Sequence, residues 1–495
     1  MKIICHLVLL LFCYTAINAQ SPSASITCRY KGVNAGTINV LLPVNNNIFW
    51  GSEKDYPVSK EGSCTIPLSK TQTGYVIIRA FNNTVVLFVQ PGDKLIADID
   101  SAKKDAVKIT GNNAEGQNLL NDGTTMPASY YSLVSKYSRD STVALIATHA
   151  QQDKEKRLSA FVPLLQQNKI NKAFFGFVKL TLDYAYAAAE GEALATKFYP
   201  TTLQPTHPSY KAVFPEDYAK AWDQLYQKYP VNNPELPRIP SFDIFSERYL
   251  NAYFWYKQVQ RGDSIKVKDE NDAVRMRMRW VDAAFPANLK EYVKASILYN
   301  IYLQQEFESV LPEVFKEYQQ QYPKSPYTPS LVSMNDKVIA YHKAANGGFA
   351  GDEQVIEDYG NINSFAGLTE KFKGKMFYID MWATWCGPCK AEFEFKDALH
   401  DYLKQKNIPM LYISMDVDKK DEQWKAMIKY YGLSGYHVRT SDALRKDLMN
   451  IFWDGKGYSI PRYVLVNAKG EIVVKNAKRP SDEQALYNQI ESHIQ

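Results

Sequence analysis

The chain has 495 residues, too many for one hydrophobic core, and this length predicts about three domains. Lysine and arginine together number 58, and aspartate and glutamate together number 53. The resulting net charge of +5 is small for this length and argues against nucleic acid or an anionic membrane as the main partner.

The first 19 residues have the organisation of a secretory signal peptide. An apolar run covers residues 3–12, and small and polar residues follow it. The run is shorter than the ~20 apolar residues that span a bilayer, and no later segment is apolar enough to do so. We therefore expect an exported protein of the periplasm or cell envelope, cleaved before Gln20 and without a membrane span afterwards. A lipoprotein acylated at Cys13 is the weaker alternative, because bulky Phe12 precedes that cysteine.

Export changes how the cysteines are interpreted, because a close pair of thiols in an oxidising compartment becomes a disulfide unless something reduces it. Two of the six cysteines, Cys5 and Cys13, belong to the predicted signal. Cys28 and Cys64 lie in two strand-like runs, "SITCRY" and "GSCTI", of one small domain. These two suggest a structural disulfide, and two separate buried thiols are the alternative.

Two predicted domains follow the signal. Residues 20–114 form a small β domain, in which short runs such as "TINVLLPV", "GYVIIRAF" and "TVVLFVQ" are separated by Asn, Gly and Pro. Residues 115–345 form a mostly helical domain. In "FPEDYAKAWDQLYQKY" apolar and aromatic residues recur every three or four positions, and "NLKEYVKASILYNIYL" and "VFKEYQQQY" repeat the pattern.

Residues 346–364 are predicted to be a linker, because "AANGGFAGDE" is rich in glycine and other small residues. Over residues 365–495 strands and helices alternate. "KMFYIDMW" and "IPMLYISMD" predict strands, "DEQWKAMIKYYG" and "SDALRKDLMNIF" predict helices, and "PRYVLVN" with "EIVVKN" predicts a hairpin. Such alternation is typical of an α/β sheet covered by helices. The predicted fold class is therefore a multidomain α+β protein.

The strongest chemical signal is "WATWCGPCK", in which two cysteines lie three residues apart where a strand gives way to a helix. The unpaired N–H groups and the dipole at a helix start favour a thiolate, so Cys386 is the predicted nucleophile. Gly387 and Pro388 form the turn, and Cys389 lies one helical turn further on, within reach of a mixed disulfide. Trp385 is predicted to shield the sulfur and to line a docking surface, with a position in the core as the alternative.

Two other interpretations of the cysteine pair are weaker. A structural zinc site needs four Cys or His ligands, and the sequence has no second CxxC and no histidine pair at the required spacing. A purely structural disulfide that closes so short a loop constrains the unfolded chain little. The sequence therefore predicts a redox-active disulfide between Cys386 and Cys389, with no metal and no cofactor.

The segment "FKGKMFYIDMWATWCGPCKAE" resembles the active site of thioredoxin-like proteins, in particular the exported TlpA/ResA-type thiol-disulfide oxidoreductases. The resemblance covers about residues 365–495 and implies a thioredoxin-like α/β domain. It further implies a buried acid six residues before the first cysteine, where Asp380 stands. It also implies a cis-proline that faces the cysteines, and "SIPRYVLV" places Pro461 there. The backbone of Ile460 is then expected to pair with a substrate strand.

Two residues depart from the pattern of this family. Glu394 stands where many members have a proline that kinks the active-site helix, so the kink is in question. Arg462 follows Pro461 where many members have threonine, a change that can alter partner preference. Near the N-terminus, "LFVQPGDKLIADI" and "VKITGNNAEGQ" resemble the β-rich domain that precedes such modules in multidomain Bacteroidetes proteins. That likeness carries no mechanism.

The resulting prediction is an exported protein-disulfide oxidoreductase that reduces or isomerises disulfides of proteins or peptides. Reduced Cys386 attacks the substrate, Cys389 resolves the mixed disulfide, and a buried Asp380 exchanges a proton with Cys389. A solvated Asp380 without such a role is the alternative. The expected partners are disulfide substrates and a membrane thiol-electron donor, with no nucleic acid.

Two functions of other classes are less well supported. One is a partner- or glycan-binding protein with an accessory thioredoxin-like domain, and the other is a peroxide-reducing enzyme on the same fold. A binding scaffold has no need of a CxxC, a buried acid and a cis-proline together. A peroxidase needs a single cysteine in an arginine-lined pocket, which this pattern does not supply.

Overall fold

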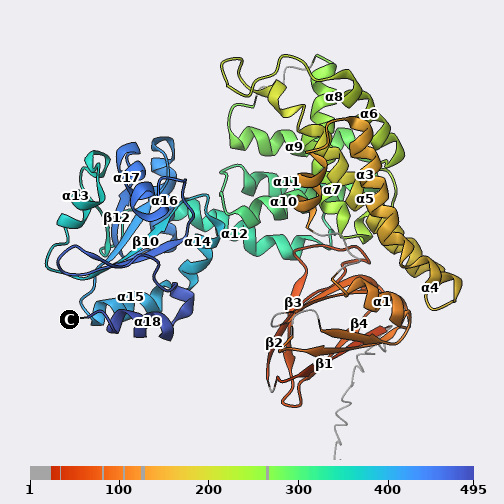
Figure 1. Cartoon of the computed structure of the whole chain (residues 1–495), viewed down its shortest axis with the longest axis horizontal. Coiled ribbons are helices and arrows are strands. Elements are labelled where there is room, and N and C mark those ends of the chain that lie inside the picture. The colour runs from red at the N-terminus through yellow and green to blue at the C-terminus, as the bar shows by residue number, and fades with distance from the viewer. Residues whose placement is uncertain are drawn as a thin grey trace, which may run out of the picture. The chain divides into compact units, whose positions relative to one another are not determined.

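The computed structural model describes residues 24–494 apart from 34, 81–82, 104–105, 124–128 and 263–266 (Figure 1). The predicted signal peptide, with Cys5 and Cys13, lies outside the described residues. Within the described part, no helix is both long and apolar enough to cross a membrane. The chain divides into two compact units, Met1–Tyr253 and Phe254–Gln495, and the division falls inside the helical region that the sequence predicted.

The first unit opens with strands β1 (Ala24–Lys31), β2 (Gly36–Leu41), β3 (Glu53–Val58), β4 (Ser63–Leu68), β5 (Gly74–Ala80), β6 (Asn83–Val89), β7 (Lys94–Asp100) and β8 (Val107–Thr110). They form two four-stranded sheets, in the orders β4-β1-β7-β8 and β3-β2-β5-β6. Along β1 and β4 every second side chain is buried, as expected of strands with one face on a core. The inward-facing residues of both sheets, Ile26, Ile66, Val40 and Val76 among them, form one apolar core.

The disulfide that the sequence suggested between Cys28 and Cys64 is not present in the structure, in which both residues are free and buried thiols. They lie directly opposite each other in the antiparallel pair of β1 and β4. Burial raises the pKa of the Cys28 thiol to about 12 and raises the pKa of Cys64 as well. Because the thiolate is the species that attacks another sulfur, burial of both groups slows formation of a bond between them.

The helices of the first unit are α1 (Ala114–Leu120), α2 (Tyr130–Tyr137), α3 (Val143–Ser159), α4 (Val162–Gln166), α5 (Lys172–Ala195), α6 (Glu216–Lys228) and α7 (Ser241–Arg248). Short 3₁₀ turns η1 (Tyr199–Thr202) and η2 (Leu236–Arg238) connect them, and a π-helix, η3 (Tyr249–Phe254), lies at the division between the units. Helix α5 is the centre of this group and packs against α2, α3, α6 and α7. In α6 the aromatic stripe of Tyr218, Trp222 and Leu225 is buried, as its spacing predicts.

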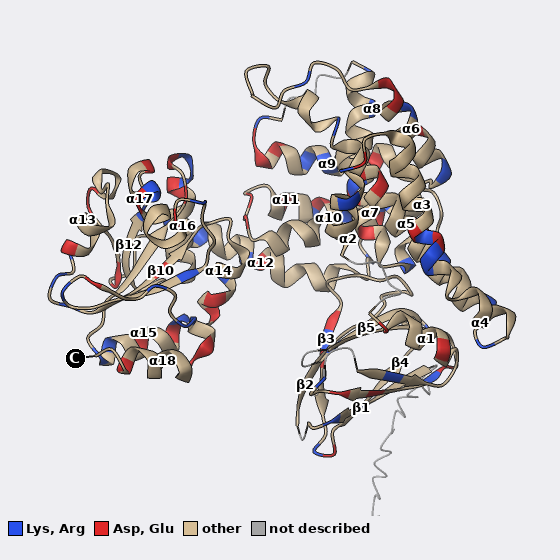
Figure 2. Ribbon diagram, viewed as in Figure 1, with Lys and Arg blue, Asp and Glu red and all other residues tan. Residues whose placement is uncertain are grey.

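The second unit begins with helices α8 (Trp255–Gln260), α9 (Glu270–Ala284), α10 (Ala287–Gln304), α11 (Leu311–Gln321) and α12 (Thr328–Ala345). Helix α12 packs against α10 and α11 and also against α16 (Asp421–Tyr431) of the C-terminal domain. In both units Lys and Arg are interspersed with Asp and Glu along the helices (Figure 2). This mixture agrees with the small net charge of the sequence.

The C-terminal domain is a six-stranded sheet in the order β14-β13-β10-β11-β12-β9. Its strands are β9 (Glu353–Val355), β10 (Phe377–Trp382), β11 (Met410–Ser414), β12 (Gly435–Arg439), β13 (Arg462–Val466) and β14 (Ile472–Val474). Its remaining helices are α13 (Phe365–Glu370), α14 (Gly387–Glu392), α15 (Lys396–Gln405), α17 (Asp442–Trp453) and α18 (Gln484–Glu491). Helices α15 and α18 cover one face of the sheet, and α13 and α17 cover the other (Figure 1).

The structure adds two strands to those that the sequence predicted. Strand β9 lies inside the predicted linker and pairs in parallel with β12, whose sequence "GYHVR" has too few apolar residues to signal a strand. The single helix expected after Cys389 is interrupted, because a 3₁₀ turn, η5 (Phe393–Phe395), separates α14 from α15. The break therefore occurs although Glu394 replaces the usual proline. The predicted fold class, with a β domain, a helical region and a thioredoxin-like α/β domain, is confirmed.

Candidate active site

The cysteine pair stands at the end of the central strand of the C-terminal sheet. All six residues of β10 are buried, and β10 pairs in parallel with β11 and antiparallel with β13. The strand ends at Trp382 and α14 begins at Gly387, so a short turn carries the chain from the sheet into the helix. Cys386 is the N-cap of α14, and Pro388 lies in its first turn, where a missing N–H costs nothing.

Cys386 and Cys389 are joined by a disulfide, with their Cα atoms 5.3 Å apart. Sγ of Cys386 accepts a hydrogen bond of 3.2 Å from the backbone N–H of Cys389. The same N–H is available to a thiolate at Cys386 after reduction, which favours the charged form of this sulfur. Cys386 is 3% exposed and Cys389 is fully buried, so the first cysteine is the one nearer to solvent.

Exposed residues surround Cys386 on the surface. Trp385 is 52% exposed and therefore lies outside the core, and Gly387 and Pro388 are exposed as well. The peptide bond between Ile460 and Pro461 is cis and directly precedes β13. Arg462 pairs with Met381 in the β10–β13 ladder. Ile460 and Pro461 therefore lie beside the end of β10 from which the chain turns toward Cys386.

Asp380 lies in the middle of β10 and is 1% exposed. Its neighbours on the adjacent strands are Tyr412 and Tyr463, and its Oδ1 has no hydrogen-bond partner in the described part of the chain. Burial, with a smaller effect of the negative charge of Glu392, raises the pKa of Asp380 well above that of a solvated aspartate. The alternative of a solvated aspartate does not describe this residue.

Glu392 is a second buried carboxylate near the cysteines, which sequence reasoning did not single out. It lies on α14, one turn beyond Cys389, and is 7% exposed. Its carboxylate accepts hydrogen bonds from the backbone N–H and the hydroxyl of Ser481, at 3.0 and 3.1 Å, and Arg479 lies 3.5 Å away. Its helical spacing from Cys389 is the signal that identifies it in the sequence.

Asp416 holds the turn before the cysteines, and it too was missed. Its carboxylate accepts hydrogen bonds from the backbone N–H and the hydroxyl of Thr384, at 2.9 and 2.8 Å, and from the hydroxyl of Ser414 at 2.7 Å. Asp416 and Thr384 are each 1% exposed. Because Thr384 lies two residues before Cys386, these bonds fix the path by which the chain reaches the first cysteine.

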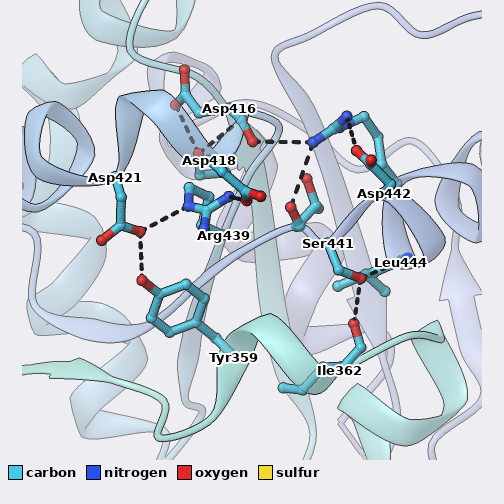
Figure 3. A network of polar contacts seen from close by, with 12 residues as sticks. Tyr359, Ile362, Asp416, Asp418, Asp421, Arg439, Ser441, Asp442 and Leu444 are labelled. Carbon is cyan, nitrogen blue, oxygen red and sulfur yellow. Dashed lines mark hydrogen bonds and ion pairs between the residues drawn. The ribbon is translucent and has the colours of Figure 1, made fainter.

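The segment after Asp416 is itself tied down by a polar network (Figure 3). Arg439, at the end of β12, lies 2.5 Å from Asp418 and 2.8 Å from Asp421, and the hydroxyl of Tyr359 donates to Asp421. The guanidinium also lies over the ring of Tyr359. These contacts join β12, α16 and the segment before α13, so the support of Asp416 comes from three separate parts of the domain.

Lys390 connects the active-site helix to the helices that precede the domain in unit two. Its ammonium donates to the backbone carbonyls of Gln304 and Gln305 at the end of α10, at 2.7 and 3.2 Å. The side chain is 4% exposed, and burial lowers the pKa of Lys390 to about 8. The amide oxygen of Gln305 accepts a bond from Tyr431 of α16, and Phe307 packs against Tyr430. The turn after α10 is thus bound to two helices of the C-terminal domain.

Among the described residues, no group of three or more His, Cys, Asp or Glu is arranged to hold a metal ion. The side chains that the structure brings together here are two thiols, three buried carboxyl groups and an exposed tryptophan. A thiolate at Cys386 can attack a disulfide, and Cys389 is placed to displace it.

Comparison with known proteins agrees with this geometry. The sequence model of the redoxin family matches residues 361–490. A thiol-disulfide oxidoreductase ResA from Bacillus thuringiensis (strain Al Hakam) is 29% identical over 112 residues, which cover 23% of this chain and 60% of the relative. A second ResA, from Bacillus thuringiensis subsp. konkukian (strain 97-27), is 36% identical over 62 residues, which cover 12% of this chain and 35% of the relative. The chain thus spans less than two thirds of the length of these relatives.

Two solved structures have similar sequences over the same domain. A putative thiol-disulfide oxidoreductase from Bacteroides vulgatus is 31% identical, with 25% of this chain and 78% of that chain covered and a TM-score of 0.21. A thiol-disulfide oxidoreductase from Bacteroides fragilis NCTC 9343 is 27% identical, with 25% and 85% covered and a TM-score of 0.21. The class that the fold and the site define is the thioredoxin-like thiol-disulfide oxidoreductases. The C-terminal domain matches the model of the redoxin family, and it is similar to ResA, as the resemblance in the sequence predicted.

Proposed function

We propose that the protein is an exported thiol-disulfide oxidoreductase that reduces or isomerises disulfides of proteins or peptides through Cys386 and Cys389. The observation that carries this proposal is the disulfide between two cysteines at the start of α14. In it, Sγ of Cys386 accepts a hydrogen bond from the backbone N–H of Cys389. A nucleophile placed in this way is more acidic than a free thiol, because the helix start stabilises its negative charge.

The reaction begins with both cysteines reduced. The thiolate of Cys386 attacks one sulfur of the substrate disulfide, and the other substrate sulfur leaves as a thiolate that takes up a proton. Cys389 then loses its proton and attacks Sγ of Cys386, which releases the second substrate thiol. Two electrons pass from the enzyme to the substrate, and the enzyme ends with the Cys386–Cys389 disulfide.

Asp380 is assigned the proton exchange with Cys389. A carboxylic acid whose pKa is raised by burial keeps its proton to higher pH than a solvated aspartate does, and it can exchange that proton with a neighbouring group. Glu392 contributes through its negative charge, which favours the protonated form of Asp380.

Substrate docking is assigned to Trp385, Gly387, Pro388, Ile460 and Pro461. The first three are exposed around Cys386, and the last two lie beside the end of β10. An extended substrate segment that pairs with the backbone of Ile460 brings its cysteine toward Cys386. The proposal has two further parts. Residues 1–19 direct export of the chain, and a membrane thiol-electron donor reduces the Cys386–Cys389 disulfide again after each turnover.

Reduction of insulin in the presence of dithiothreitol tests this function. The unaltered protein should accelerate the reaction, and Cys386→Ala should abolish the acceleration. Cys389→Ala should instead accumulate a mixed disulfide that mass spectrometry detects, because nothing displaces the bound substrate. A matched control is Cys64→Ala, which removes a buried thiol in the β domain and should leave the rate unchanged. Equal turnover by the unaltered protein and Cys386→Ala would refute the redox assignment.

A further inference from the structure

Aromatic side chains form a strip on the surface beside Cys386. Trp385 is 52% exposed and Tyr458, in the loop between α17 and β13, is 37% exposed. Their rings are 6.3 Å apart, and the ring of Tyr458 is 6.2 Å from that of Trp453 at the end of α17. Exposed aromatic rings next to a reactive group offer an apolar surface to a ligand that docks there.

A cation is fixed at the far end of this aromatic strip. The guanidinium of Arg462 lies 4.6 Å from the centre of the Trp453 ring, and its Nη1 donates to the backbone carbonyl of Lys475 at 3.0 Å. In the described part of the chain no carboxylate pairs with it, and its buried Nε has no hydrogen-bond partner. Partial burial lowers the pKa of Arg462, as expected of a cation that lacks an anion.

The nearby charges leave this place positive. Lys456 is exposed in the loop before Tyr458, and Nζ of Lys475 donates a hydrogen bond to the backbone carbonyl of Ile451. Asp454 is the acidic residue of the same loop. Three cations and one carboxylate therefore flank the strip. The cation nearest to Pro461 is Arg462, which is stacked on Trp453 and held by the carbonyl of Lys475.

We propose that Arg462, stacked on Trp453, binds a carboxylate of the substrate, so that the preferred substrates are peptide segments with an aspartate or glutamate close to the disulfide cysteine. This inference rests on the proposed function. The rings of Trp385 and Tyr458 cover the apolar residues of the same segment, and the guanidinium supplies two donors in a plane that suits a carboxylate.

The position of the acidic residue follows from the strand geometry. Arg462 is two residues beyond Ile460, which corresponds to about 7 Å of extended chain. A substrate strand that pairs with Ile460 therefore carries its carboxylate about two residues from the reacting cysteine.

The test uses three peptides with one cysteine each, presented as mixed disulfides with neutral 2-mercaptoethanol. The peptides differ only in the residues two positions to each side of the cysteine, which are Glu, Gln or Lys. Rates of reaction with the reduced full-length protein are measured at low and high salt. The unaltered protein should prefer the Glu peptide over the Gln peptide roughly fivefold at low salt, as expected of an exposed or partly buried ion pair, and less at high salt.

Three variants identify the residue responsible. Arg462→Gln should bring the Glu and Gln rates together, and Arg462→Glu should make the Lys peptide the best substrate. Arg462→Lys keeps the charge and should keep a part of the preference. Lys469→Gln, an equal loss of charge at the exposed turn beyond β13, should leave the preference intact.

Other outcomes separate this inference from the function on which it rests. If Arg462→Gln slows all three peptides equally, or keeps the preference for Glu, the carboxylate assignment is overturned and the oxidoreductase function stands. If the unaltered protein reacts at equal rates with the three peptides, the assignment is also overturned. If it reacts with none of them and does not reduce insulin, the proposed function itself fails.

Discussion

At Asp380 the chain holds a carboxylic acid away from water, between Tyr412 and Tyr463 of the neighbouring strands. Burial makes the charged form of this acid unfavourable, and the carboxylate of Glu392 adds to the effect. Such a residue costs stability whenever it ionises. The proton exchange with Cys389 proposed above would give this buried acid a role.

The replacement Asp380→Asn keeps the shape of the side chain and removes its exchangeable proton. Attack by Cys386 should continue, because its activation comes from the start of α14, while release of the mixed disulfide should slow. The loss should be largest near neutral pH and should shrink in alkali, where Cys389 ionises without help. Single-turnover rates of both proteins from about pH 6 to pH 9 measure this, and superimposable profiles would exclude a proton-transfer role.

Thermal unfolding of the same two proteins is the control for burial. The pKa of Asp380 is raised in the folded state, so the folded protein holds this proton at pH values where the unfolded chain has lost it. Its stabilising contribution is complete below the pKa of a free aspartate and is lost as the pH rises through the raised folded value. The unaltered protein should therefore lose stability relative to Asp380→Asn across this window, whereas a solvated aspartate predicts a constant difference.

Among the elements, α14 is held in part from outside the thioredoxin-like domain. Lys390 donates to the last carbonyls of α10, where a helix end leaves acceptors unpaired and where its dipole favours a cation. Among the described residues no carboxylate pairs with this ammonium, and the two carbonyl oxygens hold it in position. The contact ties the helix that carries Cys389 to a turn about 85 residues earlier in the chain.

Lys390→Met should lower the free energy of unfolding by about 1–3 kcal/mol, because it removes a charged donor and leaves two carbonyl oxygens without it. Chemical denaturation followed by tryptophan fluorescence measures the change. The matched control is Lys371→Met, at an exposed position, which should change the free energy of unfolding by less than about 0.5 kcal/mol. Equal effects of the two replacements would show that the contact with α10 contributes nothing to stability.

At the scale of the whole molecule, the C-terminal domain shares its unit with α8–α12. Phe307 and Tyr341 stack on each other and both pack against Tyr430 of α16, while Lys429 donates to the carbonyl of Ala345. These contacts cover one side of α16 with helices that lie before the predicted linker. Residues 346–364 thus join parts of one unit, Phe254–Gln495, and include strand β9 of the sheet.

A shortened chain that begins at Phe254 should fold and reduce insulin at close to the rate of the full chain, since it keeps every contact of the second unit. A chain that begins at residue 346 should have a lower melting temperature, because Tyr430 and Tyr431 lose their partners on α10–α12 and Lys390 loses its two carbonyls. Thermal unfolding and the insulin assay on both chains measure this. A higher melting temperature for the shorter chain would contradict the division at Tyr253.

Much of this architecture was accessible from the sequence. The short β-type runs separated by Asn, Gly and Pro predicted the β domain, the three- and four-residue spacing of apolar and aromatic residues predicted α6, and the strand-to-helix change placed Cys386 at a helix start. These features are local, since the residues that produce them are close together in the chain. Strands β9 and β12 escaped prediction because they are short and partly polar, and only their pairing with each other and with β11 makes them strands.

What the sequence by itself determined is the chemistry of the centre, because a CxxC at a helix start requires only residues that are neighbours in the chain. Tertiary structure alone decided the contacts that distant parts of the chain make around this centre. Asp416 reaches Thr384 from the end of another strand, Lys390 reaches the carbonyls of α10, and Arg462 stacks on Trp453 across a loop. The burial of Cys28 and Cys64, which raises the pKa of both thiols, was decided at the same level, because it depends on the packing of two complete sheets.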